Sequence, residues 1–127
     1  MPKYNIIIPP QLAPIPQDHE ISAAIILANH FTTNVTFLER LNSLHSPDLK
    51  INNLIWEVKS PKGNGKRTMQ NNLREADNQS PNIVIDLRRC KMHSSQAISR
   101  IKCELRQANK IKRLLVIKKN GEVLALK

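Results

Sequence analysis

The sequence predicts an α/β protein in which a mixed β-sheet is flanked by helices. Three observations lead there: a nearly continuous apolar run at residues 82–87, amphipathic helical patterns before and after it, and two short hairpins. A strand without polar alternation is typical of the buried centre of a sheet, where helices cover both faces. The predicted order after the N-terminal segment is helix, three strands, helix, strand, helix and two strands.

The N-terminal segment is expected to stand apart from the rest. Residues 4–8 are a short β-prone run, and four prolines within residues 9–16 then interrupt regular structure. We therefore predict a strand and a Pro-rich connector over residues 1–17. Residues 18–127 have a length suited to a single domain with one core.

The first helix is predicted over about residues 19–31, with Asp18 as its N-cap. The residues at helical spacing that should face the core are Ile21, Ala24, Ile25 and Ala28. Glu20 shares a face with Ala24 and Leu27. Such a carboxylate needs a partner, and it is either functional or a first-turn residue stabilised by the helix dipole.

A strand at 35–38 is followed by an irregular stretch and then by a hairpin of strands 49–51 and 54–59. The turn is placed at Asn52-Asn53, because asparagine tolerates positive φ.

In the second strand of that hairpin, Leu54, Trp56 and Val58 share one face, while Ile55, Glu57 and Lys59 share the other. If the Trp56 face meets the core, Glu57 and Lys59 line a cleft together. Trp56 is then a core residue and not a platform for base stacking.

The C-terminal half completes the sheet. The predicted elements are a helix over about 67–78, the strand at 82–87, a helix from Ser94 to about Asn109, and strands at 111–117 and 122–126 joined at Asn120-Gly121. Asn-Gly between two apolar strands is a strong hairpin signal.

Composition favours a polyanionic partner. The chain has 20 Lys and Arg residues against 10 Asp and Glu residues, a formal net charge of +10. Such a surplus attracts nucleic acid over long range. Neither a signal peptide nor an apolar run of about 18 residues is present. The two cysteines, Cys90 and Cys103, lack metal-ligand spacing and are expected to be reduced, partly buried thiols.

The acids near the first hairpin predict phosphodiester chemistry. Asp48 after Pro47, with Glu57 and Lys59 on the next strand, brings two carboxylates and a lysine toward one point. If Glu20 joins them, the three acids offer oxygen ligands for Mg²⁺ or Mn²⁺. The metal would lower the pKa of a bound water, and Lys59 would stabilise charge on the phosphate.

A second set of residues is expected to hold the flanking nucleic acid. The loop after Lys59 carries two glycines and several cations, which suits contacts with phosphate, although the Walker spacing is absent. The helix after it carries a polar stripe of Thr68, Asn72, Glu75 and Gln79. The predicted substrate-binding residues are Lys62, Lys66, Arg67, Thr68, Asn72, Arg88 and Arg89.

These residues carry a family resemblance. Glu20 in a first helix, Pro47-Asp48 and Glu57-Val58-Lys59 resemble the motif of PD-(D/E)XK nucleases. The longer stretch is more specific: Trp56 to Pro61, Lys66-Arg67-Thr68, Asn71-Asn72-Leu73, Gln79-Ser80 and Asn82 to Arg89. It is similar to C-terminal nuclease domains of bacterial polymorphic toxins, including tRNA-cleaving domains of contact-dependent growth inhibition proteins. The similarity runs from about residue 19 to the end.

The resemblance implies a PD-(D/E)XK-like fold and an endonuclease acting on RNA, with tRNA as the expected substrate. It also implies a cognate immunity protein, and some relatives use a translation factor. Action in the bacterial cytoplasm would follow delivery within a larger secreted protein. Because the chain begins at Met1, an excised toxin domain and a stand-alone relative both stay open.

Three alternatives stay open beside this interpretation. A DNA endonuclease of the same superfamily would use the same acids. A non-catalytic RNA-binding module would tolerate loss of Asp48, Glu57 and Lys59. A metal-free tRNase would instead depend on Lys59, Thr68, His45 and Arg88, with Asp48 structural.

Overall fold

The computed structural model describes residues 4–10, 15–38, 48–65 and 67–127, and for Asp48 the backbone only. Within these residues one sheet contains seven strands: β1 (Ile6–Ile7), β2 (Val35–Leu38), β3 (Asp48–Ile51), β4 (Leu54–Lys59), β5 (Asn82–Asp86), β6 (Arg113–Ile117) and β7 (Val123–Ala125). Three helices accompany it: α1 (Asp18–Phe31), α2 (Thr68–Asp77) and α3 (Ser94–Leu105). The predicted α/β class with a mixed sheet is confirmed.

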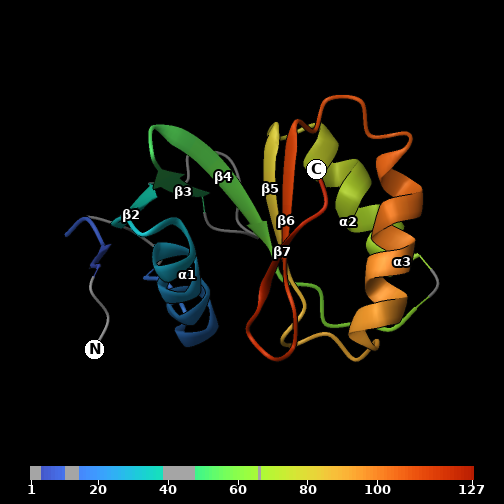
Figure 1. Ribbon diagram of the computed structural model, residues 1–127, viewed down its shortest axis with the longest axis horizontal. Coiled ribbons are helices and arrows are strands. Elements are labelled where there is room, and N and C mark those ends of the chain that lie inside the picture. The colour runs from blue at the N-terminus through green and yellow to red at the C-terminus, as the bar shows by residue number, and fades with distance from the viewer. Residues whose placement is uncertain (1–3, 11–14, 39–47, 66) are drawn as a thin grey trace.

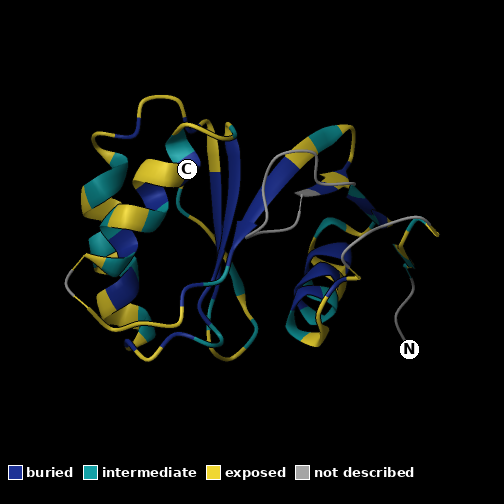
Figure 2. Ribbon diagram, turned by 180° about the vertical axis from the view of Figure 1, so that it is seen from behind, coloured by how far each residue is buried: buried dark blue, intermediate teal, exposed yellow. Residues whose placement is uncertain are grey.

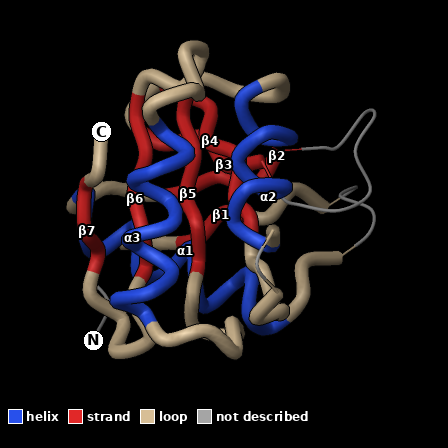
Figure 3. The backbone as a smooth tube through the Cα atoms, turned by 90° about the vertical axis from the view of Figure 1, so that its right-hand side faces the viewer, coloured by secondary structure: helices blue, strands red, loops and turns tan. Residues whose placement is uncertain are grey.

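The strands lie side by side in the order of the sequence. Pairs β1–β2, β4–β5 and β5–β6 are parallel, whereas β2–β3, β3–β4 and β6–β7 are antiparallel. Helix α1 covers one face of the sheet, and α2 and α3 cover the other (Figure 1). Figure 3 looks onto the second face and shows α2 and α3 next to each other in front of the strands. Among the described residues, no helix has the length and apolar character needed to cross a membrane.

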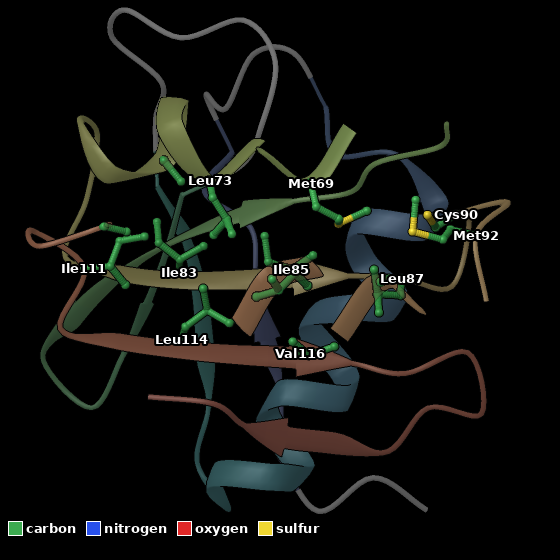
Figure 4. Close-up of a cluster of buried hydrophobic side chains, with 14 residues drawn as sticks. Met69, Leu73, Ile83, Ile85, Leu87, Cys90, Met92, Ile111, Leu114 and Val116 are labelled. Carbon is green, nitrogen blue, oxygen red and sulfur yellow. The ribbon is translucent and has the colours of Figure 1, made fainter. Parts of the chain in front are cut away.

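The central strand β5 divides the core into two clusters. Its Ile83 and Ile85 belong to the cluster that contains Met69 and Leu73 of α2 (Figure 4) and also residues of α3. Val84 packs in the cluster under α1. All five β5 residues are buried, which confirms the expectation from its unbroken apolar run. In Figure 2 the buried colour follows the middle strands and the inner sides of the helices.

Both predicted hairpin turns are confirmed. Asn52 and Asn53 have φ of 51° and 67°, the two positive values that a tight turn between twisted strands requires. The turn sets the register in which Asp48 pairs with Glu57 and Lys50 with Ile55. At the second hairpin Gly121 has φ of 88°, a backbone conformation that residues with a side chain rarely adopt.

Helix α1 begins with a different cap from the predicted one. The N-cap is Gln17 and not Asp18, and the Gln17 backbone N–H donates to Glu20 Oε1 at 2.8 Å. Ile25, predicted to face the core, is 38% exposed, and Leu27 is fully buried. Because α1 is apolar around most of its circumference, periodicity alone does not select the face that packs.

Helix α3 is shorter than predicted and ends at Leu105, not near Asn109. Its N-cap is His93, and Ser94 Oγ instead accepts a hydrogen bond from the Lys119 backbone N–H at 3.4 Å. Ala108 is nevertheless buried, because a turn after the helix still faces the core. Apolar residues at helical spacing can thus be buried by a turn as well as by a helix.

The two cysteines are free, as expected. Cys90 is buried, whereas Cys103 is exposed on α3 and not partly buried as predicted.

Candidate active site

The side chains of Glu57 and Lys59 lie on the face of β4 opposite to the one that packs against α1. Trp56 and Val58, which alternate with them, belong to the buried cluster under α1. This confirms the predicted orientation of the strand and the place of Trp56 in the core. Glu57 and Lys59 are themselves 5% and 4% exposed, so two ionisable side chains are held out of water at the end of one strand.

Lys59 is held between two carboxylates. Its Nζ donates to Glu75 Oε1 at 2.8 Å and lies 3.7 Å from Glu57 Oε1. The Glu75 side chain comes from α2 and is 51% exposed, so the cluster reaches solvent through it. An ammonium has three N–H donors, and Lys59 can therefore bind Glu75 and still donate to an arriving phosphate oxygen.

Glu75 is the member of the cluster that the sequence did not single out. It stood in the predicted polar stripe of α2, treated there as a set of sugar and base contacts. Gln79, one turn later, brings its Nε2 to 3.5 Å from the same Glu75 oxygen. The available signal was a carboxylate in the polar stripe of the helix that follows the strand of Glu57 and Lys59.

Asp48 and Glu20 complete the predicted carboxylates. Asp48 occupies the position of β3 directly opposite Glu57. Glu20 is buried on α1 and accepts the capping hydrogen bond from Gln17, which is a structural role for this carboxylate. Within the described part of the chain, no group of three or more His, Cys, Asp or Glu side chains could hold a metal ion. The three-carboxylate metal site therefore stays a prediction.

The loop after Lys59 is anchored along residues 90 and 91. The Lys91 backbone N–H donates to Lys62 O at 3.1 Å, and the Cys90 thiol lies 3.2 Å from Gly63 O. A Cβ on Gly63 would approach Thr68 Oγ1 to 3.1 Å, so glycine fits the close packing here. The side chain of Lys62 is left exposed beside the end of β4.

The start of α2 presents the next predicted contacts. Arg67 is exposed, Thr68 is half-buried, and Asn72 Nδ2 donates to Thr68 O at 2.8 Å within the helix. Pro47, His45 and Lys66 lie outside the described residues.

Arg88 has a structural set of partners. Its Nε and Nη2 donate to the two oxygens of Asp86 at 2.9 and 2.8 Å. Nη1 donates to Ser22 Oγ at 2.5 Å, and Nη2 also donates to His19 O at 3.0 Å. All three guanidinium nitrogens are thus engaged in joining the end of β5 to the start of α1.

His19 links the neighbouring Arg89 to the same junction. Arg89 Nη1 donates to His19 Nε2, which assigns the neutral imidazole as the acceptor. Burial of the ring lowers the pKa of His19, and the nearby Arg89 guanidinium lowers the pKa further.

A groove of about 400 Å³ opens beside Glu57 on the α2 side of the sheet. Its lining comes from the β3–β4 turn and from the segment between α2 and β5. The lining residues are Asn53, Leu54, Ile55, Glu57, Gln79, Ser80, Pro81 and Asn82. The cluster of Glu57, Lys59 and Glu75 therefore has a solvent-open space next to it, as a site acting on an external substrate requires.

Comparison with known proteins identifies the family. Residues 45–123 match the model of the contact-dependent growth inhibition CdiA C-terminal domain. The chain belongs to this family. The resemblance predicted from the sequence is confirmed to that extent, and the PD-(D/E)XK subtype stays a prediction.

A solved structure has the same fold as this CdiA C-terminal domain. It is the CdiA-CT/CdiI toxin and immunity complex from Burkholderia pseudomallei, with a TM-score of 0.66 and 20% sequence identity. The alignment covers 97% of this chain and 98% of that one. At this identity the likeness establishes the fold alone. No curated protein matches the sequence.

Proposed function

We propose that this CdiA C-terminal domain is a toxin endoribonuclease that hydrolyses phosphodiester bonds of tRNA. The observation that carries the proposal is the buried Glu57–Lys59 pair, bridged to Glu75 and open to a groove. Ionisable groups buried beside a groove are typical of catalytic sites, because desolvation strengthens their action on a charged substrate. The net charge of +10 supports a polyanionic substrate.

Lys59 and Glu57 would have complementary roles in the reaction. The Lys59 ammonium, fixed by Glu75, donates to a non-bridging phosphate oxygen and stabilises the negative charge that grows there. The Glu57 carboxylate accepts a hydrogen bond from the attacking water and orients it toward phosphorus. Because both side chains are held by β4 and α2, little reorganisation is needed when substrate arrives.

A divalent cation, Mg²⁺ or Mn²⁺, fits the oxygen donors of this site. Glu57 and the opposite residue Asp48 would be its protein ligands. Glu20, predicted as a third ligand, instead has the capping contact with Gln17. Mg²⁺ is commonly held by one or two carboxylates together with waters and substrate phosphates, so a cage of three acids is not required. Bound there, the cation would lower the pKa of a water and offset phosphate charge.

Flanking phosphates would be bound by the exposed cations around the end of β4. Lys62 and Arg67 have the exposure that this role needs, and Lys66 lies between them in the sequence. Thr68 and Asn72 border them at the start of α2. Arg88 and Arg89 support the site from behind, by fixing α1 to the sheet.

The family and the structural relative also suggest partners. That relative is a complex with an immunity protein, and we propose a cognate immunity protein for this chain as well. Delivery into a neighbouring cell as part of a larger secreted protein, action in its cytoplasm and help from a translation factor are further parts of the proposal.

The first test is cleavage of total tRNA and of duplex DNA, each with Mg²⁺ and with EDTA. We expect cleavage of tRNA alone and dependence on Mg²⁺. Glu57→Gln should abolish cleavage and leave tRNA binding intact or tighter, because a negative charge near phosphate is removed. Glu122→Gln, a change of the same type at an exposed site on the β6–β7 hairpin, is the matched control.

Each failure has a distinct meaning. Cleavage in EDTA would contradict the proposed dependence on a divalent cation and favour the metal-free mechanism. Cleavage of DNA in place of tRNA would contradict the proposed substrate. Binding without any cleavage would leave a nucleic-acid-binding module.

A further inference from the structure

The groove beside Glu57 has an unusual lining for so basic a protein. Glu57 is the one ionisable side chain among its eight lining residues within the described chain. The Lys59 ammonium that balances Glu57 at 3.7 Å is not among the lining residues, so the lining itself offers no cation to hold a phosphate. The groove is therefore suited to an uncharged part of the substrate, next to a site that handles the charged part.

One side of the groove is apolar. Ile55 precedes Glu57 by two residues on the same face of β4 and is 52% exposed. Leu54 and Pro81 are the other apolar residues of the lining. An exposed isoleucine in a strand otherwise directed to the core provides a flat patch on which a planar ring can pack.

The rim of the groove carries amide groups. Asn53 lies in the β3–β4 turn, where its φ is 67°, and it is exposed at the groove. Gln79 has one long contact, 3.5 Å from Nε2 to Glu75 Oε1, which leaves its carbonyl oxygen and second N–H for a ligand. Asn and Gln amides offer both donors and acceptors, as do the edges of nucleobases.

Hydrogen bonds hold the part of the groove formed by Ser80 and Asn82, at the start of β5, in place. Asn82 is 4% exposed, and its Nδ2 donates to Ile55 O at 3.1 Å while its Oδ1 accepts from Arg113 Nη1 at 3.1 Å. Ser80 Oγ donates to Asn82 O at 3.1 Å and accepts from Asn82 N–H at 3.2 Å. With both ends of the buried amide engaged, the start of β5 is fixed against β4.

We propose that this groove binds the nucleoside adjoining the scissile phosphate. The base packs on Ile55, and the amides of Asn53 and Gln79 hydrogen-bond its edge and the ribose. A volume of about 400 Å³ suits one such unit. Asn53 and Gln79 are then specificity determinants of the cleavage position. The inference rests on the proposed nuclease function and identifies a substrate subsite for it.

The first experiment follows backbone amide NMR signals of the full chain during titration with adenosine, cytidine, guanosine and uridine, all without phosphate. At least one nucleoside should shift the signals of residues 53–57 and 79–82 and leave residues 121–125 unchanged. Ile55→Asp should weaken that binding about tenfold, since the apolar contact with the base is lost and a second carboxylate is placed beside Glu57. Leu124→Asp, at an exposed apolar residue of β7, should have no effect on it.

The second experiment compares two turn variants that keep the backbone conformation. Asn52 and Asn53 both have positive φ, so glycine is tolerated at each, but only Asn53 lines the groove. We expect Asn53→Gly to lower kcat/KM for tRNA cleavage about tenfold and to relax the choice of cleavage position. Asn52→Gly should leave both at the wild-type level.

The outcomes separate this inference from the proposed function. Nucleoside shifts that are absent, or that are the same in Ile55→Asp, overturn the subsite even where tRNA is cleaved. Normal cleavage positions in Asn53→Gly overturn its role in specificity. Nucleoside binding in the groove of a protein that cleaves no nucleic acid would support the subsite and contradict the nuclease.

Discussion

Two carboxylate–cation clusters lie at the ends of the neighbouring strands β4 and β5, and they differ in how fully they are satisfied. At β5, Asp86 binds Arg88 through both carboxylate oxygens, and Ser22 and the His19 carbonyl take the remaining contacts. At β4, Lys59 is shared between Glu75 at 2.8 Å and Glu57 at 3.7 Å.

This difference indicates which of the two clusters can bind and act on a substrate. A guanidinium with every nitrogen engaged is a fixed connection between α1 and the sheet, and a substrate would have to break it. An ammonium with donors in reserve, next to a half-exposed glutamate and a groove, can take on a substrate without losing its support. We therefore propose a structural role for the Asp86–Arg88 cluster and a catalytic role for the Glu57–Lys59 cluster.

The sharpest contrast should come from Lys59→Met. Removing the ammonium should lower the rate of single-turnover tRNA cleavage by about 10²–10³-fold, because phosphate charge is no longer stabilised. The free energy of unfolding should fall as well, by about 3 kcal/mol, because Glu57 is 5% exposed and loses its counter-charge, whereas Glu75 can be solvated. Rates on prebound tRNA and urea unfolding measure the two effects. A rate near wild type would remove Lys59 from the site.

Asp86→Asn should lower stability without the loss of rate. Because Asp86 is 1% exposed, its loss leaves Arg88 partly buried without a counter-charge, which should cost about 3 kcal/mol of unfolding free energy. Cleavage per folded molecule should change little. Glu122→Gln, which breaks an exposed pair with Lys118 at 3.5 Å, should cost less than about 0.5 kcal/mol. Equal losses for the two variants would contradict the structural assignment.

The β5 cluster should also respond to pH through His19. Since burial and Arg89 lower the pKa of His19 in the folded state, the unfolded chain binds the proton first as pH falls. Its contribution to stability is therefore complete above the ordinary pKa of 6.5 and is lost as pH falls from there toward the lowered value. Urea unfolding between pH 7.5 and 5 should show a steeper loss for wild type than for His19→Gln. Parallel profiles would rule out this coupling.

The smallest effect is expected at the exposed cations beside the β4 cluster. Arg67→Ala should weaken tRNA binding modestly and reduce the slope of log K against log salt by about 1, because one phosphate contact is lost. Lys102→Ala, an exposed cation on the outer face of α3, is the control for net charge. Filter binding across several salt concentrations measures both. Equal slopes in the two variants would show that Arg67 acts through total charge only.

Local patterns predicted much of the fold. The alternation in 54–59 placed Glu57 and Lys59 on one face and Trp56 in the core, and Asn52-Asn53 located the turn that sets their register with Asp48. These predictions succeeded because side-chain alternation and turn conformation follow from the backbone of a few consecutive residues.

The errors arose where local patterns were ambiguous. Ile25 is exposed because an almost wholly apolar helix has no single marked face, and α3 ends before Asn109 because a buried turn has the same apolar spacing as a helix.

The sequence by itself thus determined the strands, the hairpins and the presence of Glu57 and Lys59 side by side. Tertiary structure alone decided which charges meet. Lys59 binds Glu75, which is 16 residues away, because α2 packs over β4. Arg88 donates a hydrogen bond to Ser22, 66 residues away, because α1 covers the other face of the sheet. The strength of an electrostatic interaction depends on the distance between the groups in space, and the packing of the helices on the sheet sets that distance.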